Sequence, residues 1–149
     1  RQADGLWANA MGAETAVSRG AGKVLIDVRR GDDPDEVRYF TFAGMATTDK
    51  FISKEPDAVA AAVRAIVKAQ KALCADPSLA HDVGKRKFPA DAAELITKVI
   101  ARDIEFYNPP TTEDGISRMN SSAQSVGHLS GPVAYDKVVA VEYRDLWQS

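Results

Sequence analysis

The chain has 149 residues and a formal net charge of −2 at pH 7, with 45% hydrophobic and 27% charged residues. This is the balance of an ordinary globular protein, and the absence of a basic stripe argues against binding of nucleic acid. No apolar run approaches the roughly 18 residues that a membrane-spanning helix needs, and the single cysteine, Cys74, excludes an internal disulfide.

The first third of the chain predicts a mixture of strands and one helix. Residues 3–9 are interpreted as a strand end that runs into a loop, and residues 11–19 as a helix that Gly20 ends. The nearly continuous apolar run at 23–28 (KVLIDV) is typical of a buried parallel strand. The alternating, aromatic-rich run at 38–43 (RYFTFA) predicts another strand. This order of elements indicates the tail of an α/β unit.

The remaining two thirds predicts a series of amphipathic helices. Apolar residues recur there at helical spacing, with charged residues on the opposite side. Proline, capping residues and glycine mark the ends of these helices. The predicted starts are Pro56, Asp76-Pro77, Pro89 and Thr111, the last in a capping-box-like pair with Asp114, and the predicted ends are Gly84 and Gly127.

The last stretch, residues 135–147, is compatible with two structures. Helical spacing favours a helix capped by Asp136, whereas the alternation of Val139, Val141 and Tyr143 fits a strand. Taken together, the chain has many predicted helices and few predicted strands to support them. We therefore expect further strands to come from a preceding N-terminal portion or from a partner chain.

An ordered set of short motifs extends along the whole chain. In order they are Ala3-Asp4-Gly5, VLIDVRR at 24–30 with Gly31-Asp32, Thr47-Thr48 with Phe51-Ile52 and Pro56, Asp76-Pro77, Phe88-Pro89, Asp103 with Phe106-Tyr107, Gly127-His128-Leu129 and Tyr135-Asp136. This set resembles the C-terminal half of the NMT1/THI5-like periplasmic solute-binding proteins, which serve ABC transporters for nitrate, sulfonates and taurine.

The resemblance implies an α/β fold of the type II periplasmic-binding-protein kind, here as a partial, helix-rich C-terminal half. Residues 1–37 would form the end of the second lobe (strand–helix–strand), residues 38–48 a hinge-crossing strand, and residues 49–149 the helical part of the first lobe. It also implies a periplasmic location, with the signal peptide outside this fragment. The implied partners are a small-molecule ligand and the membrane permease of the transporter. A homodimer of the fragment would be another way to cover its exposed faces.

Ligands of open α/β sheets bind beyond the carboxyl ends of the strands, and this rule predicts a ligand-binding site at three places. Trp7 could stack on a planar solute beside the amide of Asn9, or Trp7 could be a core aromatic residue. Arg29 could hold an anion with its planar guanidinium. Thr47 and Thr48 could orient a bound anion, or one of them could cap a turn that leads to Phe51.

Arg29 also has an alternative structural role, a surface salt bridge with Asp32, Asp33 or Asp35. No catalytic set, metal site or cofactor is predicted, because His81 and His128 lack metal-ligand spacing. We therefore expect a binding protein rather than an enzyme, the substrate-binding component of an ABC importer. Two alternatives stay open: an enzyme on the same fold that makes a thiamine pyrimidine precursor with a histidine and iron, and the effector-binding domain of a transcription regulator.

Overall fold

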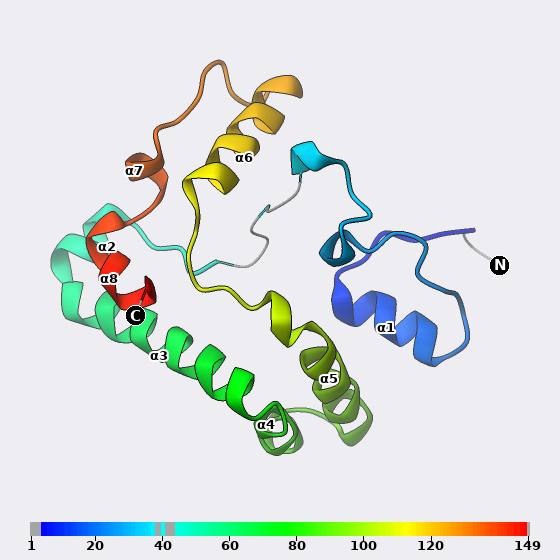
Figure 1. The fold of residues 1–149 in the computed structure, drawn as a ribbon. Helices are drawn as coiled ribbons and strands as arrows, with labels where there is room; N and C mark the ends of the chain where they lie inside the picture. Colours follow the sequence, from blue (N-terminus) through cyan, green and yellow to red (C-terminus); the bar gives the residue numbers. More distant parts are fainter. Residues whose placement is uncertain (1–3, 38–39, 41–43, 149) are drawn as a thin grey trace. The chain divides into compact units, whose positions relative to one another are not determined.

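The computed structural model describes residues 4–37, 40 and 44–148, and in these residues the chain is rich in helix (Figure 1). The chain divides into two compact units, which we describe separately. Unit 1 comprises Arg1–Asp27 and Gln70–Tyr107, and unit 2 comprises Val28–Ala69 and Asn108–Ser149. Each unit combines segments from both sides of the predicted boundaries at residues 37 and 48. The division into two lobes stays a prediction.

The first helix of unit 1, α1 (Ala10–Ser18), confirms the helix predicted at residues 11–19. Gly20 follows with φ 66°, a left-handed conformation that glycine adopts without strain. The N–H of Gly20 donates to the carbonyl of Val17 at 2.9 Å, and the N–H of Ala21 donates to that of Ala16 at 2.9 Å. This is the Schellman pattern, which satisfies carbonyls that the helix itself leaves unpaired.

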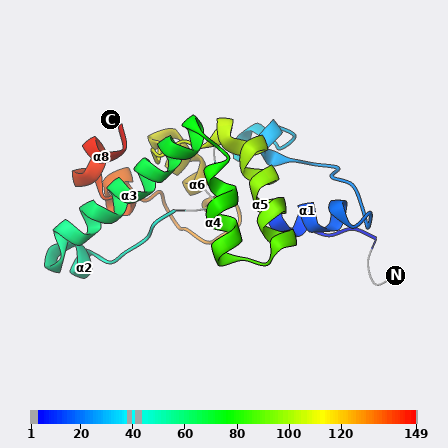
Figure 2. The same ribbon diagram turned by 90° about the horizontal axis from the view of Figure 1, so that it is seen from below.

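Helices α4 (Leu79–Lys87) and α5 (Ala90–Asp103) form a hairpin in unit 1, and they lie side by side in both views (Figure 2). The predicted start at Pro89 is confirmed. The predicted cap at Asp76 is wrong by two residues, since Ser78 occupies the N-cap position of α4, and the predicted end of α4 near Gly84 is wrong as well. Gly84 lies inside the helix and faces Ala93, where an added Cβ would come within 3.1 Å of the Ala93 Cβ. The glycine therefore permits close packing of two helices instead of ending one.

The strand predicted at residues 23–28 is not present. This segment is irregular up to the short 3₁₀ helix η1 (Val28–Arg30), and Leu25 and Ile26 are 82% and 65% exposed. A strand is stable only when its N–H and C=O groups pair with a neighbouring strand, and no strand occurs in the described residues. Residues 4–9 are not a strand either, and the strand predicted at 38–43 lies outside the described residues apart from Phe40.

Unit 2 contains the helix α6 and most of the long helix α3. Helix α3 begins at Pro56, as predicted. In order its elements are η1, η2 (Asp35–Val37), α2 (Asp49–Lys54), α3 (Pro56–Ala75), α6 (Glu113–Ser125), α7 (Tyr135–Val138), η4 (Val141–Tyr143) and α8 (Arg144–Gln148).

The two ends of α6 test the capping predictions of the sequence. The cap is Thr112, whose Oγ1 accepts from the N–H of Gly115 at 3.0 Å, so the predicted cap at Thr111 is wrong by one residue. The predicted end at Gly127 is confirmed. Gly127 has φ 77°, and the N–H groups of Gly127 and His128 donate to the carbonyls of Gln124 and Ala123.

Residues 135–147 form short helical pieces instead of one helix or a strand. Ala134 occupies the N-cap position of α7 and Asp136 lies in the first turn, so the predicted cap at Asp136 is wrong. The backbone becomes extended at Val139, with φ −119° and ψ 125°. The β-branched neighbours Val138, Val139 and Val141 favour this break because they lose side-chain freedom in a helix.

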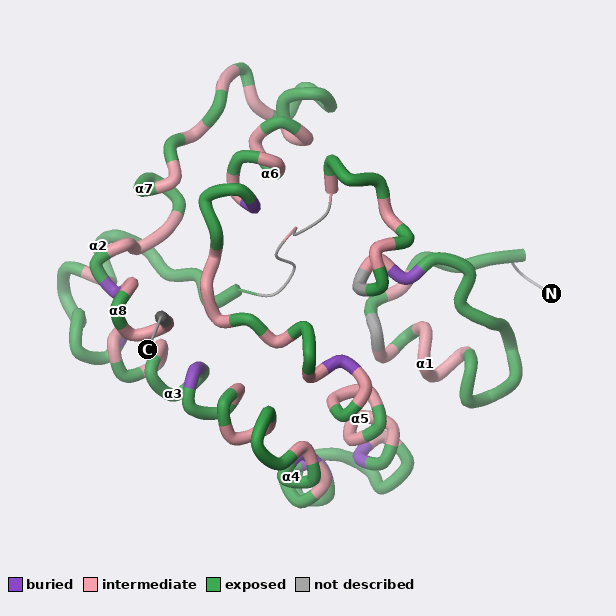
Figure 3. Tube along the Cα trace, in the orientation of Figure 1, coloured by how far each residue is buried: buried purple, intermediate pink, exposed green. Residues whose placement is uncertain are grey.

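Little apolar surface is buried in the described residues (Figure 3). The helical spacing of apolar residues from Ile116 to Val126 predicts a buried face, but Met119 on α6 and Val126 at its end are 37% and 63% exposed, so this prediction is wrong for both. A compact domain depends mainly on the burial of apolar surface for its stability, so each buried side chain matters here. The buried hydrophobic residues are Val59 and Val67 on α3, Ala80 on α4, Ala93 on α5 and Tyr143 on η4.

Candidate functional site

Trp7 and Asn9 lie in unit 1, directly before α1. Trp7 is 81% exposed, so its ring is not a core aromatic within the described structure. Asn9 is the N-cap of α1, and its Oδ1 accepts a hydrogen bond from the N–H of Gly12 at 3.1 Å. The amide oxygen of Asn9 therefore has a structural role as the cap of α1, beside the donor that the sequence predicts for a solute.

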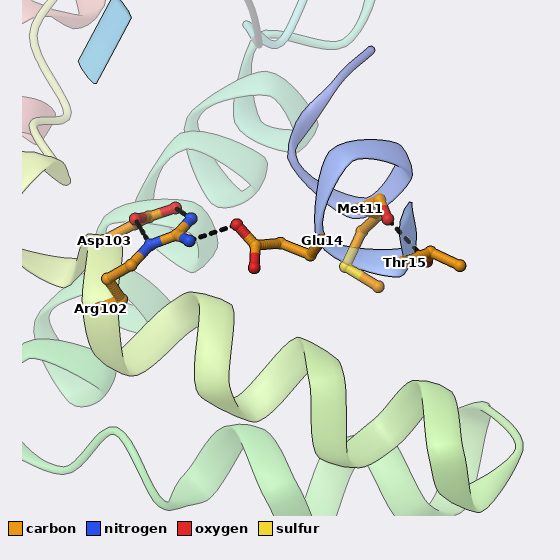
Figure 4. A network of polar contacts seen from close by, with 5 residues as sticks. All are labelled: Met11, Glu14, Thr15, Arg102 and Asp103. Atoms are coloured by element: carbon orange, nitrogen blue, oxygen red, sulfur yellow. Dashed lines mark hydrogen bonds and ion pairs between the residues drawn. The ribbon is translucent and has the colours of Figure 1, made fainter. Parts of the chain in front are cut away.

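A polar network joins α1 to α5 within unit 1 (Figure 4). Arg102, in the last turn of α5, donates from Nε to Oδ1 of Asp103 at 2.6 Å and from Nη2 to Oδ2 at 2.9 Å. Its Nη1 donates to Oε1 of Glu14 on α1. One guanidinium thus bridges two carboxylates, whereas the hydroxyl of Thr15, one residue further along α1, donates back to the carbonyl of Met11 at 2.7 Å within the same helix.

The electrostatics of this network keep Arg102 charged. The hydrogen bonds to Asp103 and then to Glu14 raise the pKa of Arg102 above its ordinary value, against the opposing effect of partial burial. The carboxylates are well shielded, since the side chains of Glu14 and Asp103 are 16% and 10% exposed. A two-pronged arginine–carboxylate contact in such surroundings is stronger and more directional than an exposed ion pair.

Tyr107 lies beside this network, just after the short helix η3 (Ile104–Phe106). Burial raises the pKa of the Tyr107 phenol, and the coulombic interactions with Asp103 and Cys74 add to the increase. The folded state therefore favours the neutral phenol more than the unfolded chain does.

This shift predicts a loss of stability at alkaline pH. An unfolded tyrosine ionises near pH 10, so the contribution of Tyr107 is complete below about pH 10 and is lost as the pH rises through the higher folded pKa. We expect the melting temperature of the unmodified chain to fall more steeply above about pH 10 than that of Tyr107→Phe. Thermal melts followed by circular dichroism measure this, and parallel pH profiles for the two proteins would contradict it.

The other predicted site residues belong to unit 2. Thr48 is the N-cap of α2, and its Oγ1 accepts from the N–H of Phe51 at 3.1 Å, which is the structural role weighed as its alternative. Thr47 is exposed beside it. Arg29 lies in η1, and its side chain is outside the described part of the chain. The structure thus places Trp7 with Asn9 and Thr47 with Thr48, and ligand binding at all five residues remains a prediction.

Unit 2 also has a shallow pocket of about 510 Å³ that the sequence did not indicate. The guanidinium carbon of Arg144 lies 5.7 Å from the centroid of the Tyr135 ring, and its Nη2 lies 3.8 Å from Oε1 of Glu113. Three carboxylates face one guanidinium, a balance that disfavours an anionic solute. The lining residues are Glu113, Tyr135, Asp136, Val141, Arg144 and Asp145.

The pocket arises from a loop closure that no local pattern reveals. Asn120 on α6 donates from Nδ2 to the carbonyl of Val133 at 2.7 Å and accepts from the N–H of Val133 at 3.0 Å. The hydroxyl of Tyr135 donates to the carbonyl of Thr111 at 2.6 Å. These contacts hold residues 133–135 against the middle of α6 and against Thr111 just before it, so the position of Tyr135 at the pocket depends on tertiary structure.

The two histidines, His81 and His128, lie in or next to helices. His128 follows Gly127 and closes the C-terminal end of α6 through its backbone N–H, and His81 is half-buried in α4. Within residues 4–37, 40 and 44–148, no group of three or more His, Cys, Asp or Glu side chains is arranged to hold a metal ion.

Among the helices that the structure describes, none is both long enough and apolar enough to cross a membrane. Comparisons of the chain with protein-family models, with curated proteins and with solved structures find no match.

Proposed function

We propose that this chain acts as the substrate-binding component of an ABC importer of the periplasmic kind. It would capture a small planar or anionic solute between the lobes of a type II periplasmic-binding-protein fold and release it to the membrane permease, without a chemical step. The proposal draws on the ordered motifs along the chain. The observation that carries it is the exposure of Trp7, at 81%, directly ahead of a capped helix.

An exposed tryptophan is a suitable contact for a planar solute. Tryptophan is usually buried in large part, so leaving its ring in water forgoes a favourable contribution to folding. The indole offers a large, rigid face with few rotatable bonds to order on binding. The N-terminus of α1, two residues further along the chain, carries the positive end of the helix dipole and favours a negatively charged group on the solute.

The apolar segment 23–28 supports the same proposal. Leu25 and Ile26 are exposed in unit 1, although the run has the composition of a buried strand. In a two-lobed binding protein this run would pair with neighbouring strands and would then bury both side chains. We propose that Trp7 and Asn9, which precede α1, lie at the cleft of that assembled fold.

The test is a solute titration with two matched tryptophan variants, because the chain contains only Trp7 and Trp147. Nitrate, taurine, benzoate and a pyrimidine are titrated into the full chain, and binding is followed by calorimetry and by thermal shift. For a solute that binds, Trp7→Ala is expected to weaken the affinity about 10-fold or more, since aromatic anchors carry much of a binding free energy. Trp147→Phe should retain the affinity.

The melting temperature separates a ligand contact from a packing role. Trp7→Ala is expected to leave the stability of the unliganded chain nearly unchanged, because exposed side chains rarely contribute more than about 0.5 kcal/mol. A parallel loss of affinity and stability would instead make Trp7 a core residue. No rise in melting temperature with any solute of the panel would contradict the binding function. Turnover that depends on added iron would favour the enzyme alternative.

A further inference from the structure

The polar network of Glu14, Arg102 and Asp103 holds the helix that follows Trp7 and Asn9. Its role in solute binding rests on the proposed function. Glu14 lies in the middle of α1, and Asn9 caps the N-terminal end of that helix. Backbone hydrogen bonds connect the successive turns of this nine-residue helix, so a contact that holds Glu14 also restricts the residues at its N-terminus. The ion pair joins Glu14 to Arg102, which are 88 positions apart in the sequence.

We propose that Arg102 is a positioning residue for the solute-binding segment. Its guanidinium, oriented by the two hydrogen bonds to Asp103, holds Glu14 and thereby places α1, with Trp7 and Asn9, against α5. Arg102 contacts no solute in this proposal. It acts through Glu14 alone.

Two observations single out this contact among those of α1. Among the described residues, the caps of α1 at Asn9 and Gly20 bond to the helix itself, so they do not fix it to α5. The helix also has no buried side chain among those described, so apolar packing provides a limited anchor. The carboxylates of Glu14 and Asp103 are in contrast largely shielded from water, where ion pairs are screened less than at the surface.

The geometry requires arginine at this position. Two nitrogens of the guanidinium bind Asp103 while the third binds Glu14, and this planar arrangement fixes the direction of the third bond. A lysine ammonium is a point charge that cannot hold both carboxylates in the same fixed geometry. We therefore expect Arg102→Lys to keep the charge but not the placement of α1.

Hydrogen exchange tests the placement without any solute. In Arg102→Gln and in Glu14→Gln, the amides of α1 are expected to exchange about 10-fold faster than in the unmodified chain, while those of α4 and of the first turns of α5 keep their rates. Glu14→Gln leaves the Arg102–Asp103 contact intact, so it isolates the bridge should Arg102→Gln fold poorly. The matched control is Lys98→Gln, which removes the ion pair between Lys98 and Glu94, 2.7 Å apart within α5.

The solute titration then connects placement to binding. For a solute whose affinity depends on Trp7, Glu14→Gln and Arg102→Lys are expected to raise the Kd about fivefold at an unchanged melting temperature, and Lys98→Gln should leave it unchanged. Unchanged exchange in α1, or faster exchange spread evenly over α1, α4 and α5, would overturn the positioning role. So would faster exchange in α1 with an unchanged Kd. If no solute binds, the proposed function fails, whereas the exchange data still report whether Arg102 places α1.

Discussion

Replacement of Ala93 by leucine is expected to lower the free energy of unfolding by about 2–3 kcal/mol, because inserting methylene groups into close-packed space forces the backbone to shift. Ala93 is 1% exposed, and the backbone of Gly84 on α4 fills the space in front of its methyl group. The two helices of the hairpin must separate to accommodate a leucine there, and the contacts along α4 and α5 are then lost.

Urea unfolding followed by circular dichroism at 222 nm measures this change. The matched control is Ala101→Leu, which makes the same substitution at an exposed position of α5 and should change the stability by no more than about 0.5 kcal/mol. The difference between the two variants isolates packing from helix propensity, since both replace alanine by leucine inside one helix. Equal unfolding midpoints for the two variants would show that the contact of Gly84 with Ala93 does not constrain the hairpin.

Gly84 also illustrates what the sequence could and could not predict. Glycine in a helical pattern is compatible with a helix end or with a close approach of another helix, and only the neighbour distinguishes the two. At Gly20 and Gly127 the first interpretation was correct, because a C-terminal cap is a local structure that a few residues determine. At Gly84 it was wrong, because the contact with Ala93 involves a second helix.

The predicted strand at residues 23–28 failed for a related reason. Composition indicated correctly that the run is apolar, but a strand forms only with a partner, and periodicity says nothing about where that partner lies. The helices α1, α3, α5 and α6 were predicted because their hydrogen bonds lie within one segment. The local part of the fold could thus be predicted, and the non-local part could not.

In the candidate site, too, local contacts could be predicted from the sequence and contacts between distant segments could not. The caps at Thr48 and Asn9 are local. The sequence offered the cap as one of two roles for Thr48, but it predicted only a ligand contact for Asn9. The bridge from Arg102 to Glu14 joins distant segments, and an arginine next to an aspartate gives no sign of it. A pattern search could only have noted that Arg102 lies in the last turn of a predicted helix, where a cation is favourable.

Replacement of Tyr143 by alanine is expected to destabilise unit 2 by about 3 kcal/mol, because truncation of a large buried aromatic ring leaves a cavity. Tyr143 is 7% exposed and is the largest of the buried hydrophobic side chains that the structure describes. Its hydroxyl donates to the carbonyl of Pro56 at 3.4 Å, which joins η4 to the start of α3.

The variant Tyr143→Phe separates the ring from the hydroxyl. A hydrogen bond of 3.4 Å is longer than the usual range, so its loss should cost less than about 1 kcal/mol. Urea unfolding compares both variants with Val138→Ala, which truncates a 53% exposed side chain nearby and should change little. If Tyr143→Phe is as damaging as Tyr143→Ala, the hydroxyl and not the buried ring holds η4 to α3. A small effect in both would mean that the last residues contribute little to the stability of unit 2, and Val59 and Val67 would then have to provide most of its apolar core.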